Sequence, residues 1–175
     1  PLCHIANSGG ALQIPESRLD MVRCGILMYG VYPAPHLQER VSVQLCMRWV
    51  SRIVYFKVVR PFHPVSYGST WQSEEETRIV TIPVGYGDGY PRSMSNRAEV
   101  LIRGKRYPIV GRICMDQAMV NIGWDEAYNG EEVILLGSQG NECIKPEELA
   151  IWASTITYEI LCTINARVPR HYIYG

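Results

Sequence analysis

Alternation of apolar and polar residues dominates the later part of the chain. From residue 41 onward the odd positions Val43, Leu45 and Met47 are apolar, whereas Ser42 and Gln44 between them are polar. A two-residue period is typical of a strand with one buried face, so a strand is expected to run from residue 41 to about residue 49. Similar signals recur further along, which predicts an all-β domain. These further strands are expected at residues 78–84, 99–103, 106–110, 113–122 and 132–136.

The first part of the chain has a different pattern. Residues 21–30 are mostly apolar without alternation, which favours a strand buried on both faces, as in a parallel sheet or barrel. Residues 7–12 resemble a loop that leads into a helix and presents a hydroxyl and backbone N–H groups to an anion. Pro33 and Pro35 then interrupt the chain. We therefore expect residues 1–35 to be the tail of an α/β domain and residues 36–175 to form the β domain.

Turn and helix signals complete the expected elements. Gly104-Lys105 suits a tight hairpin turn with glycine in the first position of type II′. A helix is predicted from Pro146 to about Ser154, because a proline followed by acidic residues is favourable in a first turn. A second short helical stretch is expected to begin near Tyr158 and to end before Pro169.

Composition and charge narrow the classes of function. The 175 residues are 47% hydrophobic and 19% charged, which predicts a folded core. Lys plus Arg and Asp plus Glu both number 17, and no run of like charge occurs, so nucleic acid is not expected as a partner. An oligonucleotide-binding β-barrel ranks last for the same reason. No secretory signal or membrane-spanning apolar run is visible, so we expect no membrane and a cytoplasmic protein, although a segment upstream of Pro1 would be out of view.

Six cysteines are widely spaced and form no CxxC pair. Neither a metal site nor a redox couple is therefore expected. Most of these cysteines are predicted to be reduced thiols, buried as small hydrophobic side chains.

Three segments carry candidate chemistry. Tyr67 stands beside a glycine in a loop, residues 84–92 are dense in glycine and tyrosine, and Arg112 and Asp116 lie in an otherwise apolar stretch. Each also has a purely structural interpretation: a surface turn tyrosine, ordinary glycine turns and a structural ion pair. None of these segments identifies a function by itself.

Seven motifs occur in order along nearly the whole chain, at residues 4–8, 22–26, 65–68, 85–89, 111–117, 158–159 and 167–170. Taken together, they resemble the alanine racemase family. Members of this family have an N-terminal (β/α)8 barrel that carries pyridoxal phosphate on a lysine, followed by a mostly β, barrel-like domain, and they act as head-to-tail homodimers. By this resemblance, residues 1–35 are the last part of the barrel and residues 36–175 the C-terminal β domain.

The resemblance implies interconversion of L-alanine and D-alanine, which supplies D-alanine for cell-wall peptidoglycan. Racemisation removes the α-proton from one face of the amino acid and returns a proton to the other, so two acid/base groups are required. Tyr67 resembles one of them and is expected to reach into the partner subunit's barrel. The other is the cofactor lysine, a role that Lys57, Lys105 and Lys145 do not fill because they all lie in the predicted β domain. The chain alone is therefore expected to be inactive.

The resemblance also assigns cofactor residues. Arg23 resembles the residue that faces the pyridine nitrogen, to which a guanidinium can only donate, leaving a weaker electron sink than a pyridinium. His4 would hydrogen-bond Arg23 from behind. The phosphate binders implied by the resemblance are Ser8, Gly25, Ile26 and Tyr158.

Substrate residues follow in the same way. Met115 would offer its backbone to the substrate carboxylate in the neighbouring site, and Tyr86 would also lie close to the substrate. Charged groups near the entrance can steer a small zwitterion. The entrance positions implied by the resemblance are Arg92, Arg112, Asp116 and Arg170.

Three related alternatives remain. Amino-acid decarboxylases use the same cofactor with an acidic residue at the pyridine nitrogen, which Arg23 argues against. Serine racemases tend to have a smaller polar residue in place of Tyr158, so alanine is favoured as the substrate. A non-catalytic, racemase-like binding module is the third alternative. Without the barrel that should bury Ile26 and Met28, residues 1–35 are expected to bind something, such as another copy's apolar surface, or to become disordered. A solvated, monomeric strand at residues 20–30 would contradict this expectation.

Overall fold

The structure is a computed structural model that describes residues 1–173, and the chain divides into two compact units, Pro1–Met47 and Arg48–Gly175. The first unit is built from short helical turns. The side chain of Asn7 caps the first of them by accepting a hydrogen bond of 2.9 Å from the Gly10 N–H, which confirms the predicted helix start. The elements of this unit are α1 (Ser8–Gln13) and the 3-10 helices η1 (Pro15–Arg18), η2 (Ile26–Tyr29) and η3 (Pro35–Glu39).

The strand expected at residues 21–30 is wrong. Arg23 makes one isolated parallel bridge with Asn7, and the apolar run after it forms η2, which ends at Gly30 with a φ of 75°. An apolar run without alternation does not distinguish a buried strand from a short helix. Within the described part of this unit, only Asn7 pairs with the segment, so no ladder forms. Met28, on η2, is 73% exposed.

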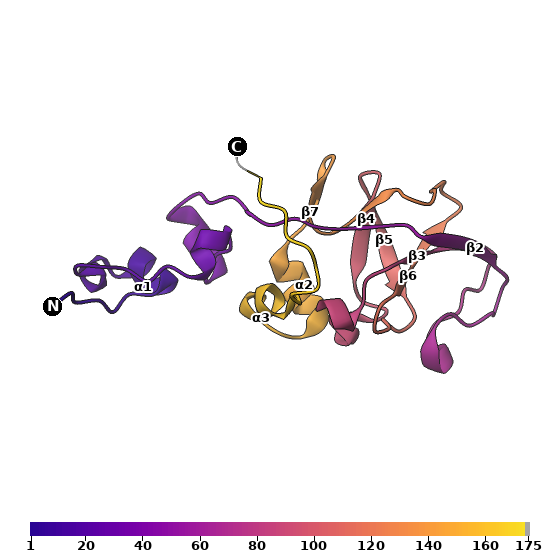
Figure 1. Cartoon of the computed structure of the whole chain (residues 1–175), viewed down its shortest axis with the longest axis horizontal. Helices are drawn as coiled ribbons and strands as arrows, with labels where there is room; N and C mark the ends of the chain where they lie inside the picture. Colours follow the sequence, from indigo (N-terminus) through magenta and orange to yellow (C-terminus); the bar gives the residue numbers. More distant parts are fainter. Residues whose placement is uncertain (174–175) are drawn as a thin grey trace. The chain divides into compact units, whose positions relative to one another are not determined.

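The second unit is an eight-stranded antiparallel sheet with two α-helices (Figure 1). Its strands run in the order β1-β7-β4-β5-β6-β3-β2, and β8 pairs with β7. The strands are β1 (Trp49–Arg52), β2 (Tyr55–Val59), β3 (Thr77–Ile82), β4 (Glu99–Ile102), β5 (Lys105–Val110), β6 (Ala118–Gly123), β7 (Glu132–Gln139) and β8 (Glu142–Ile144). The 3-10 helices η4 (Tyr67–Ser69), η5 (Tyr86–Asp88) and η6 (Arg92–Met94) lie in its loops.

The two ends of this strand order are neighbours in the sequence. Only Ile53 and Val54 separate β1 from β2, and the Val54 N–H donates to the Thr81 carbonyl of β3 at 2.9 Å. The segment from β1 to β2 therefore pairs with β7 in its first half and with β3 in its second half. This arrangement closes the sheet upon itself and confirms the predicted mainly β, barrel-like fold.

The strand expected from residue 41 onward begins only at Trp49. Burial still alternates before it, since Val43 and Leu45 are half-buried and Ser42 and Gln44 are exposed. A period of two indicates which side chains face the protein, whereas a strand also needs a paired neighbour. Residues 41–48 have no ladder partner among residues 1–173. Strands β2 and β8 were not expected from the sequence.

Two local expectations near the hairpins are corrected. In the β4–β5 hairpin Ile102 pairs with Lys105, so the turn residues are Arg103 and Gly104, one position earlier than expected. Both have positive φ, 52° and 73°, which is typical of a type I′ turn and not of type II′. Residues 113–117, expected as the start of a strand, precede β6.

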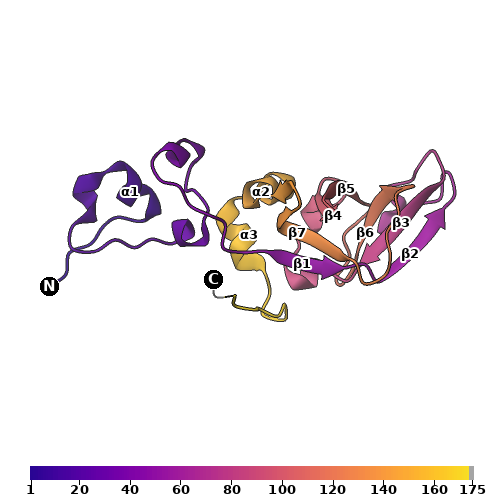
Figure 2. The same ribbon diagram turned by 90° about the horizontal axis from the view of Figure 1, so that it is seen from above.

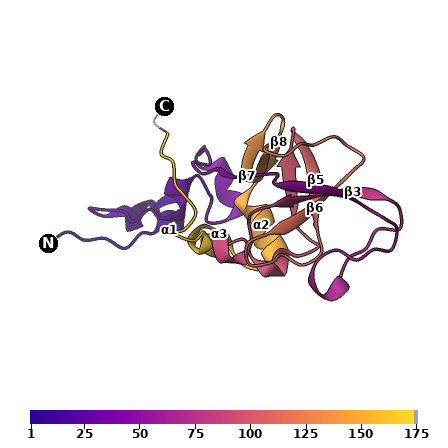
Figure 3. The same ribbon diagram turned by 45° about the vertical axis from the view of Figure 1, so that its right-hand side comes forward.

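Helices α2 (Pro146–Ala153) and α3 (Thr157–Thr163) lie at the end of the sheet away from β2 (Figure 2). The predicted helix at residues 146–154 is confirmed, with Ser154 as its C-cap, and the second expected helix is confirmed as α3, which begins one residue before Tyr158 and ends before Pro169. Figure 3 shows β8 beside β7, next to these helices. The core of this unit includes Val80, Val100 and Leu135, which lie on β3, β4 and β7 and are fully buried.

The six cysteines are free, as predicted, but their expected burial is wrong. Cys3, Cys46 and Cys162 are exposed, and the others are half-buried. Branched and aromatic side chains such as Ile82 and Tyr90 fill the core instead.

Candidate functional site

Tyr67 stands on a turn that is anchored on both sides. Val65, just before it, is buried and packs with Val59, Ile79 and Val110 in a hydrophobic cluster. Pro64 and Gln72 form a bridge across the base of the loop. The Tyr67 side chain itself is 73% exposed. A fixed turn therefore presents the phenol to the outside.

Arg112 lies beside this turn. Its backbone carbonyl accepts a hydrogen bond of 2.6 Å from the Ser66 hydroxyl, and a methyl group built on Gly68 would lie 3.2 Å from its Nε. The structure thus brings Tyr67 and Arg112, two predicted site residues, into one place. A guanidinium keeps its proton at any ordinary pH, so a permanent cation flanks the tyrosine turn.

The glycine-rich loop that carries Tyr86 lies against a second predicted segment. The Tyr86 N–H donates to the Cys114 carbonyl at 3.0 Å, and the Gly87 N–H donates to the Met115 carbonyl at 2.9 Å. A methyl group on Gly85 would lie 2.2 Å from the Cys114 carbonyl oxygen, so only glycine fits there. Tyr86 and Met115, both partly exposed, are therefore neighbours.

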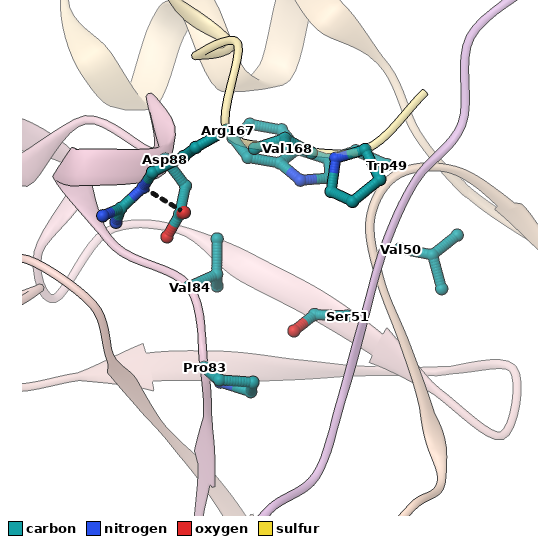
Figure 4. A pocket seen from close by; sticks show the side chains of 9 residues that line it. Trp49, Val50, Ser51, Pro83, Val84, Asp88, Arg167 and Val168 are labelled. Carbon is teal, nitrogen blue, oxygen red and sulfur yellow. Dashed lines mark hydrogen bonds and ion pairs between the residues drawn. The ribbon is translucent and has the colours of Figure 1, made fainter. Parts of the chain in front are cut away.

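Arg167 ties this loop to the end of the chain. Its Nε donates to Asp88 at 2.8 Å (Figure 4). One of its terminal nitrogens donates to Asp116 at 2.6 Å. Hydrogen bonds to Asp116 and Asp88 raise the pKa of the Arg167 guanidinium. Asp116, expected near the entrance, is therefore already paired. Residues 167–170 were noted as a motif in which either arginine could pair with a carboxylate, and Arg167 does so.

A small pocket borders the Asp88–Arg167 pair (Figure 4). Its volume is about 160 Å³, below the several hundred Å³ typical of ligand sites. The pocket is lined by Trp49, Val50, Ser51, Pro83, Val84, Asp88, Arg167, Val168 and Pro169.

The other predicted residues of the second unit lie apart from these contacts. Arg170 donates to the backbone carbonyls of Ile164, Asn165 and Val168, and so fixes the chain after α3. Arg92 is exposed on η6, and Tyr158 is 45% exposed on α3. No hydrogen bond within the described residues joins the side chains of Arg92, Tyr158 or Arg170 to Tyr67 or Tyr86.

In the first unit, the predicted phosphate binders gather around Ser8. The buried Ser8 hydroxyl accepts hydrogen bonds from the Gly25 N–H at 3.0 Å and from the Leu27 N–H at 3.4 Å. Ile26, between these donors, is buried. The Ser8 hydroxyl proton has no acceptor among residues 1–173, which leaves it available to an anion.

Arg23 and His4 are also brought together. A terminal nitrogen of Arg23 hydrogen-bonds Nδ1 of His4, and the same guanidinium reaches the carbonyls of His4 and Ile5 at 3.5 and 3.4 Å. Because a guanidinium can only donate, His4 accepts through Nδ1. The histidine therefore orients the arginine.

Within residues 1–173, no cluster of three or more His, Cys, Asp or Glu side chains is placed to hold a metal ion. Over the same span, no helix is both long and apolar enough to cross a membrane.

Comparisons with known proteins decide the family. The chain matches the family model "Alanine racemase, C-terminal domain" over residues 46–172 and "Alanine racemase, N-terminal domain" over residues 1–33. The chain belongs to the alanine racemase family. The alanine racemase of Symbiobacterium thermophilum is 48% identical over 170 residues, which are 97% of this chain and 45% of that protein. The alanine racemase of Halothermothrix orenii is 43% identical over 98% of this chain and 46% of its own length.

Solved structures of the family agree. The alanine racemase from D-cycloserine producing Streptomyces lavendulae has a TM-score of 0.94 and 40% identity, over 99% of this chain and 46% of its own. The Bacillus anthracis alanine racemase with bound L-Ala-P has a TM-score of 0.95 and 36% identity, over 99% of this chain and 45% of its own. The chain thus spans about half the length of the alanine racemases it matches.

Proposed function

We propose that the protein interconverts L-alanine and D-alanine with pyridoxal phosphate and so supplies D-alanine for cell-wall peptidoglycan. The observation that carries this proposal is the exposed phenol of Tyr67 on an anchored turn beside the Arg112 guanidinium, in a chain of the alanine racemase family. A group that moves a proton to and from a substrate must be both reachable and fixed. A neighbouring cation can also attract the carboxylate of an amino acid.

The residues of the first unit fit pyridoxal phosphate. The free proton of the Ser8 hydroxyl suits a phosphate oxygen, and a methyl group on Gly25 would meet nothing within 4 Å, so the backbone there is open to a ligand. When bound, pyridoxal phosphate withdraws electrons from the amino acid's Cα and makes its α-proton removable. Arg23, held by His4, would donate to the pyridine nitrogen and keep it unprotonated. Ile26 and Tyr158 are assigned to the phosphate by the family resemblance.

Tyr67 would move a proton at its phenol oxygen on one face of the amino acid. Racemisation needs a second acid/base group on the other face. Lys57 lies on β2, Lys105 pairs with Asp125 at 3.1 Å, and Lys145 caps α2, so all three lysines belong to the second unit. We therefore assign the second group to a lysine outside residues 1–175.

The remaining predicted residues would serve the substrate. The Met115 carbonyl is already occupied by the Gly87 N–H, so the Met115 N–H is the group proposed to bind the substrate carboxylate. We further propose a cytoplasmic homodimer with a shared active site, and alanine as its substrate in preference to serine because of Tyr158. Tyr86 would contact the substrate, and the entrance would be formed by Arg92, Arg112, Asp116 and Arg170.

The test is a measurement on the natural gene product that carries this sequence. Intact mass, pyridoxal absorbance and D-alanine formation from L-alanine are determined on one sample. Tyr67→Phe, which removes only the phenol oxygen, is expected to lower kcat by about 10²- to 10⁴-fold. Tyr128→Phe is the matched control, because Tyr128 is also exposed, at 57%.

Two outcomes would contradict the proposal. A colourless, inactive natural product would favour a binding module over an enzyme. Unchanged turnover in Tyr67→Phe would remove the tyrosine from the reaction.

A further inference from the structure

Asn96 connects the Tyr67 turn to the segment that carries Arg112. Its side-chain oxygen accepts a hydrogen bond of 2.5 Å from the Gly111 N–H. Its side-chain nitrogen donates to the Thr70 hydroxyl at 3.3 Å and to the Thr70 carbonyl at 3.4 Å. One amide therefore holds two segments that are far apart in the sequence.

The turn needs such restraint because its backbone is strained. Ser66, directly before the tyrosine, has φ 67° and ψ 179°, a region populated almost only by glycine. Strain of this kind persists only where surrounding contacts enforce it. The Ser66 hydroxyl supplies one such contact through its bond to the Arg112 carbonyl.

The second contact passes through Gly111. Its φ is 72°, and a methyl group built on it would lie 2.6 Å from the Val65 carbonyl oxygen and 2.7 Å from Ser66 Cβ. The backbone of Gly111 thus presses directly against the strained residue. Asn96 holds Gly111 in place by accepting a hydrogen bond from the Gly111 N–H. Gly111 lies against Ser66, so Asn96 also restrains Ser66 and the adjoining Tyr67.

We propose that Asn96 is a positioning residue for Tyr67. This inference rests on the proposed function, in which the Tyr67 phenol moves a proton. Asparagine suits the role because its amide offers a donor and an acceptor together, and because it tolerates positive φ, which is 58° here. A displacement of about 1 Å at a proton-transfer group can lower a rate by about 10²-fold, so a loosened turn would be felt in turnover.

Two substitutions separate the backbone from the amide. Asn96→Gly keeps the positive φ but removes both hydrogen-bonding groups. Asn96→Asp keeps the acceptor for Gly111 and loses the donor to Thr70, so it is expected to rescue part of the loss. Asn141→Gly, at an exposed turn between β7 and β8, is the matched control.

The kinetic test uses the natural gene product. In Asn96→Gly we expect kcat to fall by about 10- to 100-fold, with KM changed by less than about threefold, because the turn is misplaced while substrate binding is kept. The double variant Tyr67→Phe with Asn96→Gly is expected to be no slower than Tyr67→Phe alone, since residues that act through one another are not additive. Additive losses would overturn the proposal.

Hydrogen exchange supplies a readout that does not depend on the cofactor. Peptides that cover residues 65–71 and 111–113 are expected to exchange faster in Asn96→Gly than in the unsubstituted protein or in Asn141→Gly, with an unchanged denaturation midpoint. Unchanged exchange in these peptides would overturn the proposal. Should Asn96→Gly fail to fold, Asn96→Asp is measured in the same way, with faster exchange in residues 65–71 expected.

Failure of this inference is distinct from failure of the proposed function. Full turnover in Asn96→Gly together with collapse in Tyr67→Phe would reject the positioning role alone. Full turnover in Tyr67→Phe would reject the proposed function, and with it the role of Asn96 in catalysis, whatever the exchange experiment shows.

Discussion

Tyr90 has a buried hydroxyl that lacks a hydrogen-bond partner among the described residues. Its ring is fully buried and packs edge-to-face on Trp49, with centroids 5.7 Å apart. Burial raises the pKa of this hydroxyl well above its usual range. The ring thus contributes packing, whereas the unpaired hydroxyl is costly.

Tyr90→Phe is therefore expected to stabilise the protein. The change removes the unpaired oxygen and keeps the ring, which should raise the free energy of unfolding by about 1 kcal/mol. Urea denaturation at pH 7 measures it. A loss of stability would mean that the hydroxyl has a partner after all.

Tyr107 predicts a response to alkaline pH. Burial, together with the hydrogen bond that its hydroxyl donates to Asp125 at 2.6 Å, raises its pKa to about 12. The unfolded chain releases this proton near pH 10, so between pH 10 and about pH 12 the folded protein binds more protons and loses stability as the pH rises. Tyr107→Phe should flatten this loss, as followed by denaturation midpoints from pH 9 to 12. An unchanged slope would contradict the assignment.

Site residues could be predicted from the sequence where they belong to a local motif, but not where a partner distant in the sequence determines their position. Tyr67, Tyr86 and Met115 stand in motifs whose letters are visible along the chain. Arg167 owes its place to Asp88, which lies 79 residues earlier, and no local pattern reports that pairing. Asn96 was missed for the same reason.

At the scale of elements, Arg106 on β5 joins three structural pieces. Its guanidinium donates to Glu148 at 2.7 Å, to Glu142 at 2.8 Å and to Glu99 at 3.2 Å, and it also reaches the Cys143 carbonyl. These partners belong to α2, β8 and β4. The hydrogen bond to Glu148, with those to the other carboxylates, raises the pKa of Arg106.

Arg106→Met should cost about 2 kcal/mol of unfolding free energy, because the carboxylates lose their shared partner and are left beside one another. Urea denaturation gives the value. Arg48→Met is the matched control: its pair with Glu132 is exposed on both sides, and a surface pair of this kind is worth less than about 1 kcal/mol. Equal losses in the two variants would show that the shared contacts add nothing.

Strands could be predicted from the sequence where their apolar residues are the ones that the fold buries. The strands near residues 78–84 and 99–103 follow from their own apolar residues: Val100, Leu101 and Ile102, in succession, are all buried on β4. β2 was missed because Tyr55, Phe56 and Val58 are apolar yet all exposed, so no buried period marks the strand. The strand prediction for residues 21–30 failed because a continuous apolar run does not distinguish a buried strand from a short helix, and most of these residues are exposed.

At the scale of the whole molecule, the division of the chain rests on contacts that a sequence does not display. Pro33 and Pro35 predicted a domain boundary at residue 35, whereas the boundary between the compact units follows Met47. The match to the N-terminal domain ends at residue 33 and the match to the C-terminal domain begins at residue 46, which leaves a connecting stretch between them. The role of residues 1–35 as a contact surface stays a prediction.

The pairing of β1 with β7 has a consequence for synthesis on the ribosome. Arg48 and Glu132, which bond across this pair, are 84 residues apart. At a translation rate of about 5 to 20 residues per second, the partner strand emerges roughly 4 to 17 s after β1. During that interval Trp49 has no sheet partner to cover it, and nascent chains on one messenger expose the same apolar segment together. Chaperone access during that interval would help to keep this apolar segment from associating with other chains.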